Sequence, residues 1–558
     1  MKFKTVFLGL AALSITIASC GEKESPENGG DGGSTVPSGN VEIKPVRDLN
    51  SILKNPLNGW VMYVSSTADP SYFDTEFTVN TGETVKVRDY ASCFYVRAGW
   101  KKFNPEPDKY FWQIPDDPLN KLYQRAQELG LPMAFRVVVD GRDQGENTPE
   151  WVYDKGAAYW PSSGLPRFSD RKVPDVMDPV WRACYEKFIE DFAAEFNDPS
   201  KIAFIDAYGL GKWGEGHNVC YEGLEVTGTE EENGVTYPAY GDGIVSDKTA
   251  EYKKNTMEWI TGLYSRCFTN VPLVINYHRQ IGHPRSSGAQ AQPDSEELLE
   301  IAIKNGYSLR SDAIGMTNND WGYNDWERSF VAKWNCTGSD LVNRRPVLME
   351  GGYIVSSHSY WNDPKGYRQG HPEDVRQGEF DESREARVNM MDFRVGDETK
   401  SWFENAFSLV EQFVQEGGYR LYPDLVTVPE KVAIGSDITV TSRWRNAGWG
   451  YCPTNIPQWN QKYKVAFALL DMETDSPVYQ FVDMDTDLST WLSSAPTSYT
   501  FDISMKSVAI GGYTWAVGIV DTTLDEGEGI HPIGIQVAVN KDSLTEDGWV
   551  KLTNVTVN

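Results

Sequence analysis

The sequence predicts a (β/α)8 barrel of the α/β class, followed by an all-β sandwich of immunoglobulin-like type. Two observations carry this prediction. Between about residues 50 and 420, short β-rich runs alternate with longer segments of helical periodicity, which indicates parallel strands joined by crossover helices. After about residue 423 the helical periodicity stops, and short runs of alternating apolar and polar residues continue to the end of the chain.

Eight runs in the first region have the length and the β-branched or aromatic content of strands. These runs are Gly59–Val64, Ser92–Ala98, Met133–Val139, Ile202–Tyr208, Pro272–Asn276, Leu309–Met316, Pro346–Glu350 and Val388–Phe393. Eight strands separated by helical segments predict a closed barrel with long loops. A doubly wound open sheet is the main alternative, but no GxGxxG turn follows any early strand.

Helical segments lie between these runs. In residues 119–129, apolar residues recur at steps of three and four, as on one face of a helix. Asp178 followed by Pro179 is typical of an N-cap and a first helical turn. Asp294 and Glu297 have the spacing of a capping box, which predicts that the Asp294 side chain caps the next helix.

The N-terminus has the order of a secretory signal: Lys2 and Lys4, an apolar run over residues 6–17, and small residues up to Cys20. That run is shorter than the roughly 20 residues of a membrane-spanning helix. Residues 17–20, Ile-Ala-Ser-Cys, resemble the lipobox of bacterial lipoproteins, in which the cysteine becomes the lipid-modified first residue. A plain signal peptide with a chance cysteine is the alternative. We therefore expect a signal peptide over residues 1–19 and lipidation of Cys20.

The predicted domain boundaries follow from composition. Residues 20–40 are rich in Gly and Ser and nearly free of large apolar side chains, which predicts a flexible tether. The barrel is expected over residues 41–423 and the sandwich over residues 424–558. The acidic residues 22–24, Glu-Lys-Glu, resemble the surface-export tag of lipoproteins from Bacteroidota. We expect an outer-membrane lipoprotein at the cell surface. Attachment to the periplasmic face of the outer membrane is the alternative.

Net charge and histidine content restrict the classes of function that this chain can have. A formal net charge of -28 argues against nucleic-acid binding, which requires clustered Lys and Arg. The six histidines show no HxxxH or HxH spacing, so we expect no metal site and no cofactor. The content of 19 Trp and 28 Tyr suits stacking on sugar faces, so we expect a carbohydrate partner. Large cores also use these residues. We also expect a monomer that is linked to the membrane only by its lipid.

Two glutamates are the leading catalytic candidates. In a barrel of this kind, functional residues lie at the C-terminal ends of the strands. Glu215 follows the fourth predicted strand and Glu350 ends the seventh, and each is flanked by glycine. A single glutamate in such a place is usually a solvated or salt-bridged carboxylate. Two on one rim are what glycoside hydrolysis needs, one to protonate the leaving oxygen and one to attack the anomeric carbon or activate water.

Several short motifs support this interpretation. Four motifs are similar to the β-galactosidase-like barrels of clan A glycoside hydrolases: residues 55–60 (Asn-Pro-Leu-Asn-Gly-Trp), 96–100 (Val-Arg-Ala-Gly-Trp), 104–107 (Asn-Pro-Glu-Pro) and 110–112 (Tyr-Phe-Trp). Residues 213–217, 418–420 and 446–448 resemble a group of Bacteroidota lipoproteins that join such a barrel to an immunoglobulin-like sandwich.

The resemblance implies that Glu215 is the acid/base and Glu350 the nucleophile, with retention of anomeric configuration. Clan A enzymes usually have an asparagine just before the acid/base, where it bonds the sugar 2-hydroxyl, and this chain has Gly214 there. Either another residue takes over that contact, with Asn276 and His217 as candidates, or the site no longer catalyses.

Other residues at the strand ends are candidates for substrate binding. The set is Arg97, Trp100, Asp140, His217, Asn276, Tyr277, Trp321 and Trp361. The three tryptophans are expected either to stack on sugars or to pack between loops. Arg97 is expected to orient the nucleophile or to form a structural ion pair, and Asp140 to accept a hydrogen bond from a sugar hydroxyl. His217 is expected next to the catalytic groups and not as a base.

These observations predict a retaining β-glycoside hydrolase that acts on an oligosaccharide or polysaccharide at the cell surface, in polysaccharide utilisation. The alternative is a surface lipoprotein that keeps the barrel cleft, binds glycan and no longer catalyses. Gly214 is the main support for that alternative.

Overall fold

A computed structural model shows how the chain folds. It describes residues 39–140, 147–160, 172–217, 219, 226–232, 235–240, 247–282, 294–315, 325–353, 355, 372–493, 495–527 and 529–558. The predicted signal peptide, Cys20, most of the tether, Trp321 and Trp361 lie outside the described residues.

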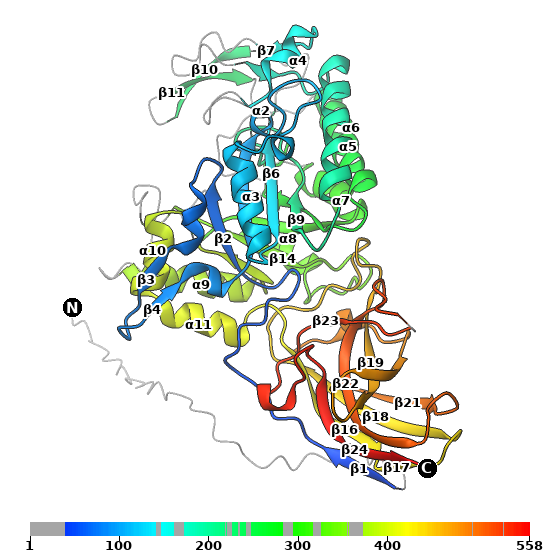
Figure 1. Cartoon of the computed structure of the whole chain (residues 1–558). Helices are drawn as coiled ribbons and strands as arrows, with labels where there is room; N and C mark the ends of the chain where they lie inside the picture. Colours follow the sequence, from blue (N-terminus) through cyan, green and yellow to red (C-terminus); the bar gives the residue numbers. More distant parts are fainter. Residues whose placement is uncertain are drawn as a thin grey trace, which may run out of the picture.

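Eight parallel strands close into a barrel, which confirms the predicted fold (Figure 1). They are β2 (Gly59–Ser65), β5 (Ala91–Gly99), β6 (Met133–Val138), β9 (Ile202–Asp206), β12 (Leu273–Tyr277), β13 (Tyr307–Ile314), β14 (Val347–Gly351) and β15 (Met390–Asp392). Each strand coincides with one of the eight predicted runs. The barrel closes where β15 pairs with β2, with Met390 opposite Gly59.

Helices surround the barrel as an outer layer (Figure 1). The longer ones are α3 (Pro118–Glu128), α5 (Pro179–Phe196), α6 (Asp247–Cys267), α7 (Ser295–Lys304), α8 (Asp325–Trp334), α9 (Pro372–Glu385), α10 (Asp397–Asn405) and α11 (Phe407–Glu416). The connections between the barrel strands contain three short helices, α1 (Val87–Tyr90), α2 (Trp100–Phe103) and α4 (Glu150–Asp154). They also contain three strand pairs, β3–β4 (Glu76–Thr78, Thr84–Lys86), β7–β8 (Tyr159–Trp160, Val173–Pro174) and β10–β11 (Val226–Glu232, Val235–Tyr240).

One of the two predicted helix caps forms. The Asp178 side chain accepts hydrogen bonds from the backbone N–H groups of Val180 and Trp181 at 3.0 and 2.8 Å, as an N-cap does. The capping box predicted for Asp294 is wrong. Asp294 has helical backbone angles (φ -100°, ψ -2°), so its side chain makes no cap bond and forms an ion pair with Lys253 of α6 instead.

The C-terminal region is a second, all-β unit of two main sheets. One sheet has the order β1 (Asn40–Ile43), β16 (Leu421–Pro429), β18 (Asp437–Asn446) and β21 (Thr497–Ser504). The other has the order β17 (Lys431–Val432), β24 (Val550–Val557), β22 (Gly511–Asp521), β19 (Tyr463–Asp471) and β20 (Pro477–Val482), with β23 (Ile533–Ile535) paired to β22. Apolar side chains of both sheets share one core, as in a sandwich.

Strand β1 corrects one detail of the predicted boundary. Sequence analysis placed residues from 41 onward in the barrel, but β1 pairs antiparallel with β16, with Val41 opposite Val428 (Figure 1). The segment satisfies backbone groups along the outer edge of β16, which would otherwise be an open edge strand. The chain therefore passes through the sandwich before it enters the barrel.

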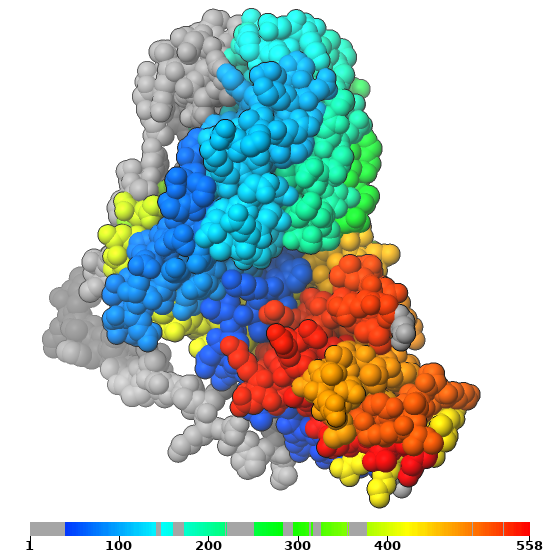
Figure 2. All heavy atoms as spheres, in the orientation of Figure 1, coloured from blue at the N-terminus to red at the C-terminus, as the bar shows by residue number. Residues whose placement is uncertain are grey.

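The sandwich packs against the N-terminal end of the barrel, as Figures 1 and 2 show. Val61 and Leu348, which point into the barrel, belong to the same buried apolar cluster as Trp444 and Phe467 of the sandwich. Hydrogen bonds also cross this junction, among them one from Trp449 Nε1 to the Val388 carbonyl at 2.7 Å. The sandwich thus forms the floor of the barrel and leaves the C-terminal end of the strands for the site.

Candidate active site

Each barrel strand contributes one residue to a layer of side chains inside the barrel, above the apolar floor. Successive side chains on a strand alternate between its two faces, so inward residues are spaced by two. The layer consists of Tyr63, Tyr95, Arg136, Asp206, Asn276, Arg310, Glu350 and Asp392, all buried. We call it the polar layer. An ionic network in this place is unlike the branched apolar layers that usually fill such barrels.

Arg136 joins the two predicted catalytic glutamates. Its Nη1 donates to Glu215 Oε1 at 2.6 Å, and its Nη2 donates to Glu350 Oε2 at 3.0 Å. The same guanidinium donates from Nη2 to Asn276 Oδ1 at 2.7 Å and from Nε to Asp206 Oδ2 at 2.8 Å. Glu215 and Glu350, which are 135 positions apart in the sequence, therefore face one space around a single guanidinium group.

Glu350 is held by three arginines. Arg394 Nη1 donates to Oε1 at 2.5 Å, while Arg136 and Arg310 both donate to Oε2. Burial alone would raise the pKa of Glu350, but the charges of Arg310, Arg136 and Arg394 outweigh it and hold this pKa well below its usual value. Glu350 is therefore a carboxylate at neutral pH, as a nucleophile must be.

Arg310 extends the network to the eighth strand. Its Nη2 donates to Asp392 Oδ2 at 3.2 Å, and its guanidinium carbon lies 4.4 Å from the centre of the Tyr95 ring. Burial raises the pKa of Asp392 to about 6, although Arg394 and Arg310 act in the opposite direction. Asp392 also accepts a hydrogen bond from the Gly351 N–H at 3.2 Å, which ties β15 to the residue after Glu350.

The turn that carries Glu215 explains why no asparagine precedes it. Gly214 has a φ of +76°, and a Cβ added there would lie 3.1 Å from Arg136 Cδ and 3.2 Å from a Val138 methyl carbon. A side chain at this position would be strained and would displace Arg136. The preceding residue, Trp213, also has a positive φ of 60°. This strained turn brings the Glu215 carboxyl over the polar layer.

Glu215 and the two histidines form a compact group. Glu215 Oε1 accepts hydrogen bonds from Arg97 Nη1 at 2.9 Å and from Arg136 Nη1 at 2.6 Å. His217 Nε2 lies 3.9 Å from Glu215 Oε2, and its ring stacks on His278 at 4.1 Å. His278 Nε2 is 2.7 Å from the Glu215 carbonyl oxygen. The two histidines therefore lie directly beside the turn that carries Glu215.

Two predicted substrate-binding residues lie elsewhere. Trp100 is completely buried in α2, where its ring packs edge-on against Trp151 and Trp181. Because Tyr277 alternates with inward-facing Asn276, it points outward, and its ring stacks on Phe330 of α8 at 5.9 Å. Trp100 therefore packs against neighbouring rings, which is the alternative expected for it, and Tyr277 lies on the outer face of the barrel, where the predicted contact with substrate does not fit.

Arg97, Asp140 and Asn276 do lie at the mouth side of the barrel. Arg97 forms an ion pair with Glu215, which is the structural alternative for this residue and not the predicted contact with the nucleophile. Asp140 is buried directly after β6, and its backbone carbonyl accepts a hydrogen bond from the Asn147 side chain. Asn276 accepts a hydrogen bond from Arg136 on its oxygen, and its buried Nδ2 has no hydrogen-bond partner in the described part of the chain. That amide is a donor available to a ligand.

The charged partners of the two glutamates were not predicted from the sequence. These are Arg136, Asp206, Arg310, Asp392 and Arg394. Their signal was a charge inside a run that is otherwise apolar, such as Met-Ala-Phe-Arg-Val-Val over residues 133–138. Because an unpaired buried charge is costly, an arginine at an inward strand position predicts a carboxylate on a neighbouring strand.

The described residues hold two further results that bear on ligands. In this part of the chain, no group of three or more His, Cys, Asp and Glu side chains is arranged to hold a metal ion. No helix in the same ranges has both the length and the apolar content needed to cross a membrane.

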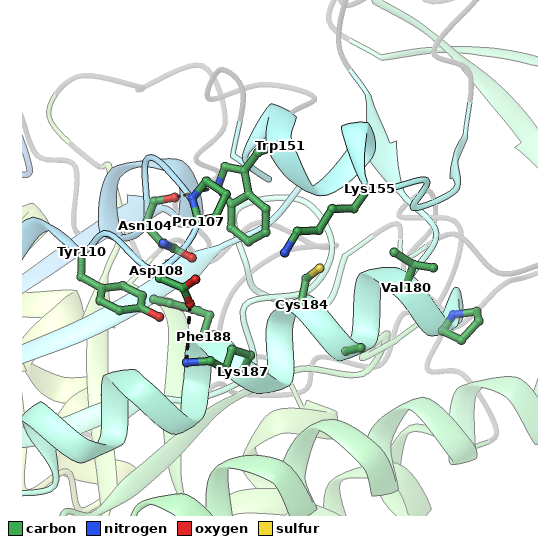
Figure 3. A pocket seen from close by; sticks show the side chains of 12 residues that line it. Asn104, Pro107, Asp108, Tyr110, Trp151, Lys155, Val180, Cys184, Lys187 and Phe188 are labelled. Carbon is green, nitrogen blue, oxygen red and sulfur yellow. Dashed lines mark hydrogen bonds and ion pairs between the residues drawn. The ribbon is translucent and has the colours of Figure 1, made fainter.

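A cavity of about 410 Å³ lies on the outer helical layer (Figure 3). Its walls come from the loop over residues 104–110, from α4 and from the first half of α5. Lys155 lies 4.8 Å above the Trp151 ring, and Lys187 pairs with Asp108 at 3.7 Å across the opening. Neither catalytic candidate lines this cavity, so it is separate from the site in the barrel.

Comparison with known proteins gives structural similarity only. No known family matches the chain, and no curated protein matches it. Similar structures include the endo-beta-1,4-mannanase from Thermotoga petrophila, at 11% identity and a TM-score of 0.35, covering 90% of this chain and 98% of that one. Endo-glycoceramidase II from Rhodococcus sp. has 12% identity and a TM-score of 0.34, covering 81% and 99%.

A glycoside hydrolase family 30 xylanase from Clostridium acetobutylicum has 8% identity and a TM-score of 0.34, covering 83% of this chain and 95% of that one. By name these proteins act on glycans or glycolipids. At such identities and TM-scores the similarity assigns neither a substrate nor catalytic residues to this chain.

Proposed function

We propose that this protein is a retaining β-glycoside hydrolase that uses Glu350 as nucleophile and Glu215 as acid/base. The observation that carries the proposal is the Arg136 guanidinium, which bonds both carboxylates at the C-terminal end of one closed barrel. Two carboxyl groups facing one space are the minimal machinery for cleaving a glycosidic bond. Buried donors such as Asn276 Nδ2 surround them and suit sugar hydroxyls.

The two glutamates have different surroundings, and the proposed roles follow from this. Glu350 is bonded by three arginines and stays ionised, so it attacks the anomeric carbon. Glu215 accepts hydrogen bonds from Arg97 and Arg136 on Oε1, and we assign the acid proton to Oε2, on the side of His217. That proton passes to the leaving oxygen, and Glu215 then takes a proton from the water that releases the sugar.

A glycan-binding protein without catalysis is the second candidate, and one observation favours it. Both oxygens of Glu350 already accept hydrogen bonds from arginine, which occupies the lone pairs that a nucleophile must present. In this alternative the polar layer is a structural ionic network, and the mouth above it binds sugar without cleaving it.

The test is hydrolysis of a panel of aryl β-glycosides and β-linked glycans by protein that lacks the leader. We expect the parent protein to release product with the β-anomer formed first, as followed by proton NMR. Glu350→Gln and Glu215→Gln should each lower kcat by about 100-fold or more, with a smaller loss for Glu215→Gln on aryl glycosides whose leaving group needs no proton.

Glu382→Gln is the matched control. Glu382 is also buried and ion-paired, but it contacts Arg328 and the Gly315 N–H, which lie outside the polar layer. Hydrolysis that survives in both catalytic variants would contradict the proposed roles. Sugar binding by the parent protein without any turnover across the panel would favour the second candidate.

We also propose that the site works at the cell surface. The support is the sequence Ile-Ala-Ser-Cys at residues 17–20 and the Gly- and Ser-rich segment that follows it. Cys20→Ser should abolish labelling by a radioactive fatty acid and release the protein from the membrane fraction. Protease added to intact cells should digest the parent protein. Complete protection from the protease would instead indicate the periplasmic face.

A further inference from the structure

Three side chains line one sector of the barrel mouth, on the adjacent strands β15, β2 and β5 and the residue positions just after them. They are Arg394, Tyr63 and Arg97, and we call them the Arg–Tyr–Arg cradle. The Arg394 guanidinium carbon lies 5.2 Å from the centre of the Tyr63 ring. Arg394 also has a positive φ of 53°, an uncommon backbone conformation for a residue other than glycine.

The cradle presents hydrogen-bond donors. The Tyr63 hydroxyl and Arg394 Nε are buried, and neither has a hydrogen-bond partner among the residues that the structure describes. Burial raises the pKa of Tyr63, against the lowering effect of Arg97 and Arg394, so the hydroxyl is protonated at neutral pH. A guanidinium group can only donate. Because a buried donor without an acceptor is costly, this sector fits a group that is rich in acceptors.

The charge balance of the site points the same way. Among the described residues, the network holds four arginines (Arg97, Arg136, Arg310, Arg394) and four carboxylates (Asp206, Glu215, Glu350, Asp392), which balance formally.

The proposed mechanism changes that balance. Glu215 must be protonated before the glycosidic bond breaks. Arg97 and Arg136 face its carboxyl, His217 lies 3.9 Å from Oε2, and His278 contacts its carbonyl oxygen. With Glu215 neutral, the four arginines of this described network face three carboxylates, so the network carries one net positive charge and Arg97 loses the charge of its carboxylate partner.

We propose that the Arg–Tyr–Arg cradle receives an anionic substituent of the glycan, a sugar carboxylate or a sulfate ester, and that Glu215 takes up one proton when this group binds. The proton comes from solvent and bonds to Oε2, while the anion becomes the new acceptor for Arg97 and the Tyr63 hydroxyl. This inference rests on the proposed acid/base role of Glu215. It names the substrate class as acidic glycans.

The test is calorimetric binding to the full folded protein, using methyl 1-thio-β-glycosides, which are not hydrolysed. Each neutral hexoside is paired with the hexuronide and the 6-sulfate of the same configuration. For at least one configuration, an anionic member should bind about tenfold tighter or more than its neutral match. The binding enthalpy is measured at pH 7 in two buffers of different ionisation enthalpy, and its difference between the buffers gives the number of protons taken up on binding. We expect about one proton for the anionic ligand and none for the neutral one.

Variants separate the cradle from a general loss of structure. Glu215→Gln keeps the shape of the side chain and leaves the positive charge uncompensated, so it should bind the anionic ligand more tightly and without proton uptake. Tyr63→Phe should weaken anionic binding several-fold and neutral binding less. Arg443→Gln, which removes an arginine paired with Asp424 in the sandwich at 2.7 Å, should change neither.

The outcomes distinguish this inference from the proposed function. Equal affinity for neutral and anionic partners, weaker anionic binding by Glu215→Gln, or no binding of any member would overturn the cradle. Preference for the anionic ligand with proton uptake, in a protein that hydrolyses no glycan, would keep the cradle and reject the hydrolase. Hydrolysis of neutral glycans without tighter binding of the anionic ligands would support the hydrolase and reject the cradle.

Discussion

Replacement of Glu379 by glutamine should change how the stability of the protein depends on pH. Glu379 lies in α9 and is completely buried. Its Oε2 accepts a hydrogen bond from Arg376 at 2.5 Å, while Oε1 has no hydrogen-bond partner among the described residues. Burial raises the pKa of Glu379 from 4.5 to about 8; Glu398 and Asp392 add to this effect, and Arg376 opposes it.

The sign of the effect follows from proton linkage. Between pH 4.5 and about 8 the folded protein keeps the Glu379 proton and the unfolded chain has lost it, so the free energy of unfolding falls as pH rises. From pH 5 to pH 7 this one group should cost about 2 to 3 kcal/mol of stability. In Glu379→Gln that contribution is absent, so the variant should become more stable relative to the parent by about this amount over the interval.

Urea unfolding followed by tryptophan fluorescence at pH 5, 6 and 7 measures the difference. Glu385→Gln is the control, because Glu385 belongs to the same helix and its side chain is 49% exposed. It should leave the pH dependence of the parent unchanged. Parallel stability curves for the parent and Glu379→Gln would show that Glu379 is already ionised in the folded protein, and the reasoning would then be wrong.

Three further substitutions test packing and backbone. Gly214→Ala should lower both the melting temperature and kcat, because Gly214 has a positive φ and the added Cβ would contact Arg136. Gly262→Ala is the matched control in α6, where an added Cβ meets no atom within 4 Å. It should raise the free energy of unfolding in urea by about 0.5–1 kcal/mol. Trp100→Ala should cost about 3–5 kcal/mol in the same assay without changing the glycan affinity of the folded protein. Asp178→Ala should cost about 1 kcal/mol through loss of the α5 cap.

The barrel was predictable because its strands are buried on both faces. Each strand therefore appears in the sequence as a short apolar run with β-branched or aromatic residues, bounded by turns, and eight such runs can be counted. The β1 strand was not predictable in this way. Four residues, Asn40–Ile43, carry no pattern of their own, and only the edge of β16, nearly 400 positions away in the sequence, gives them a partner.

The site was predictable in part for a similar reason. Glycine on both sides of Glu215 and after Glu350 marks places where backbones come close, and both glutamates do lie in the network. Tyr277 and Trp100 could not be placed, because proximity to a strand end does not say which face a side chain takes. The alternation of inward and outward residues decides that, and it requires the exact strand register.

The apolar floor and the polar layer together explain why ligand chemistry and protonation should be linked in this protein. Below the layer lies the core shared with the sandwich, whose apolar side chains offer no acceptor to an arginine. Any carboxylate that gains a proton therefore leaves a guanidinium charge that can be neutralised only from the open, C-terminal side. A neutral sugar supplies no charge for this purpose, whereas an acidic sugar does. The balance of four arginines against four carboxylates among the described residues therefore leads us to expect that this site binds acidic sugars more tightly than neutral ones.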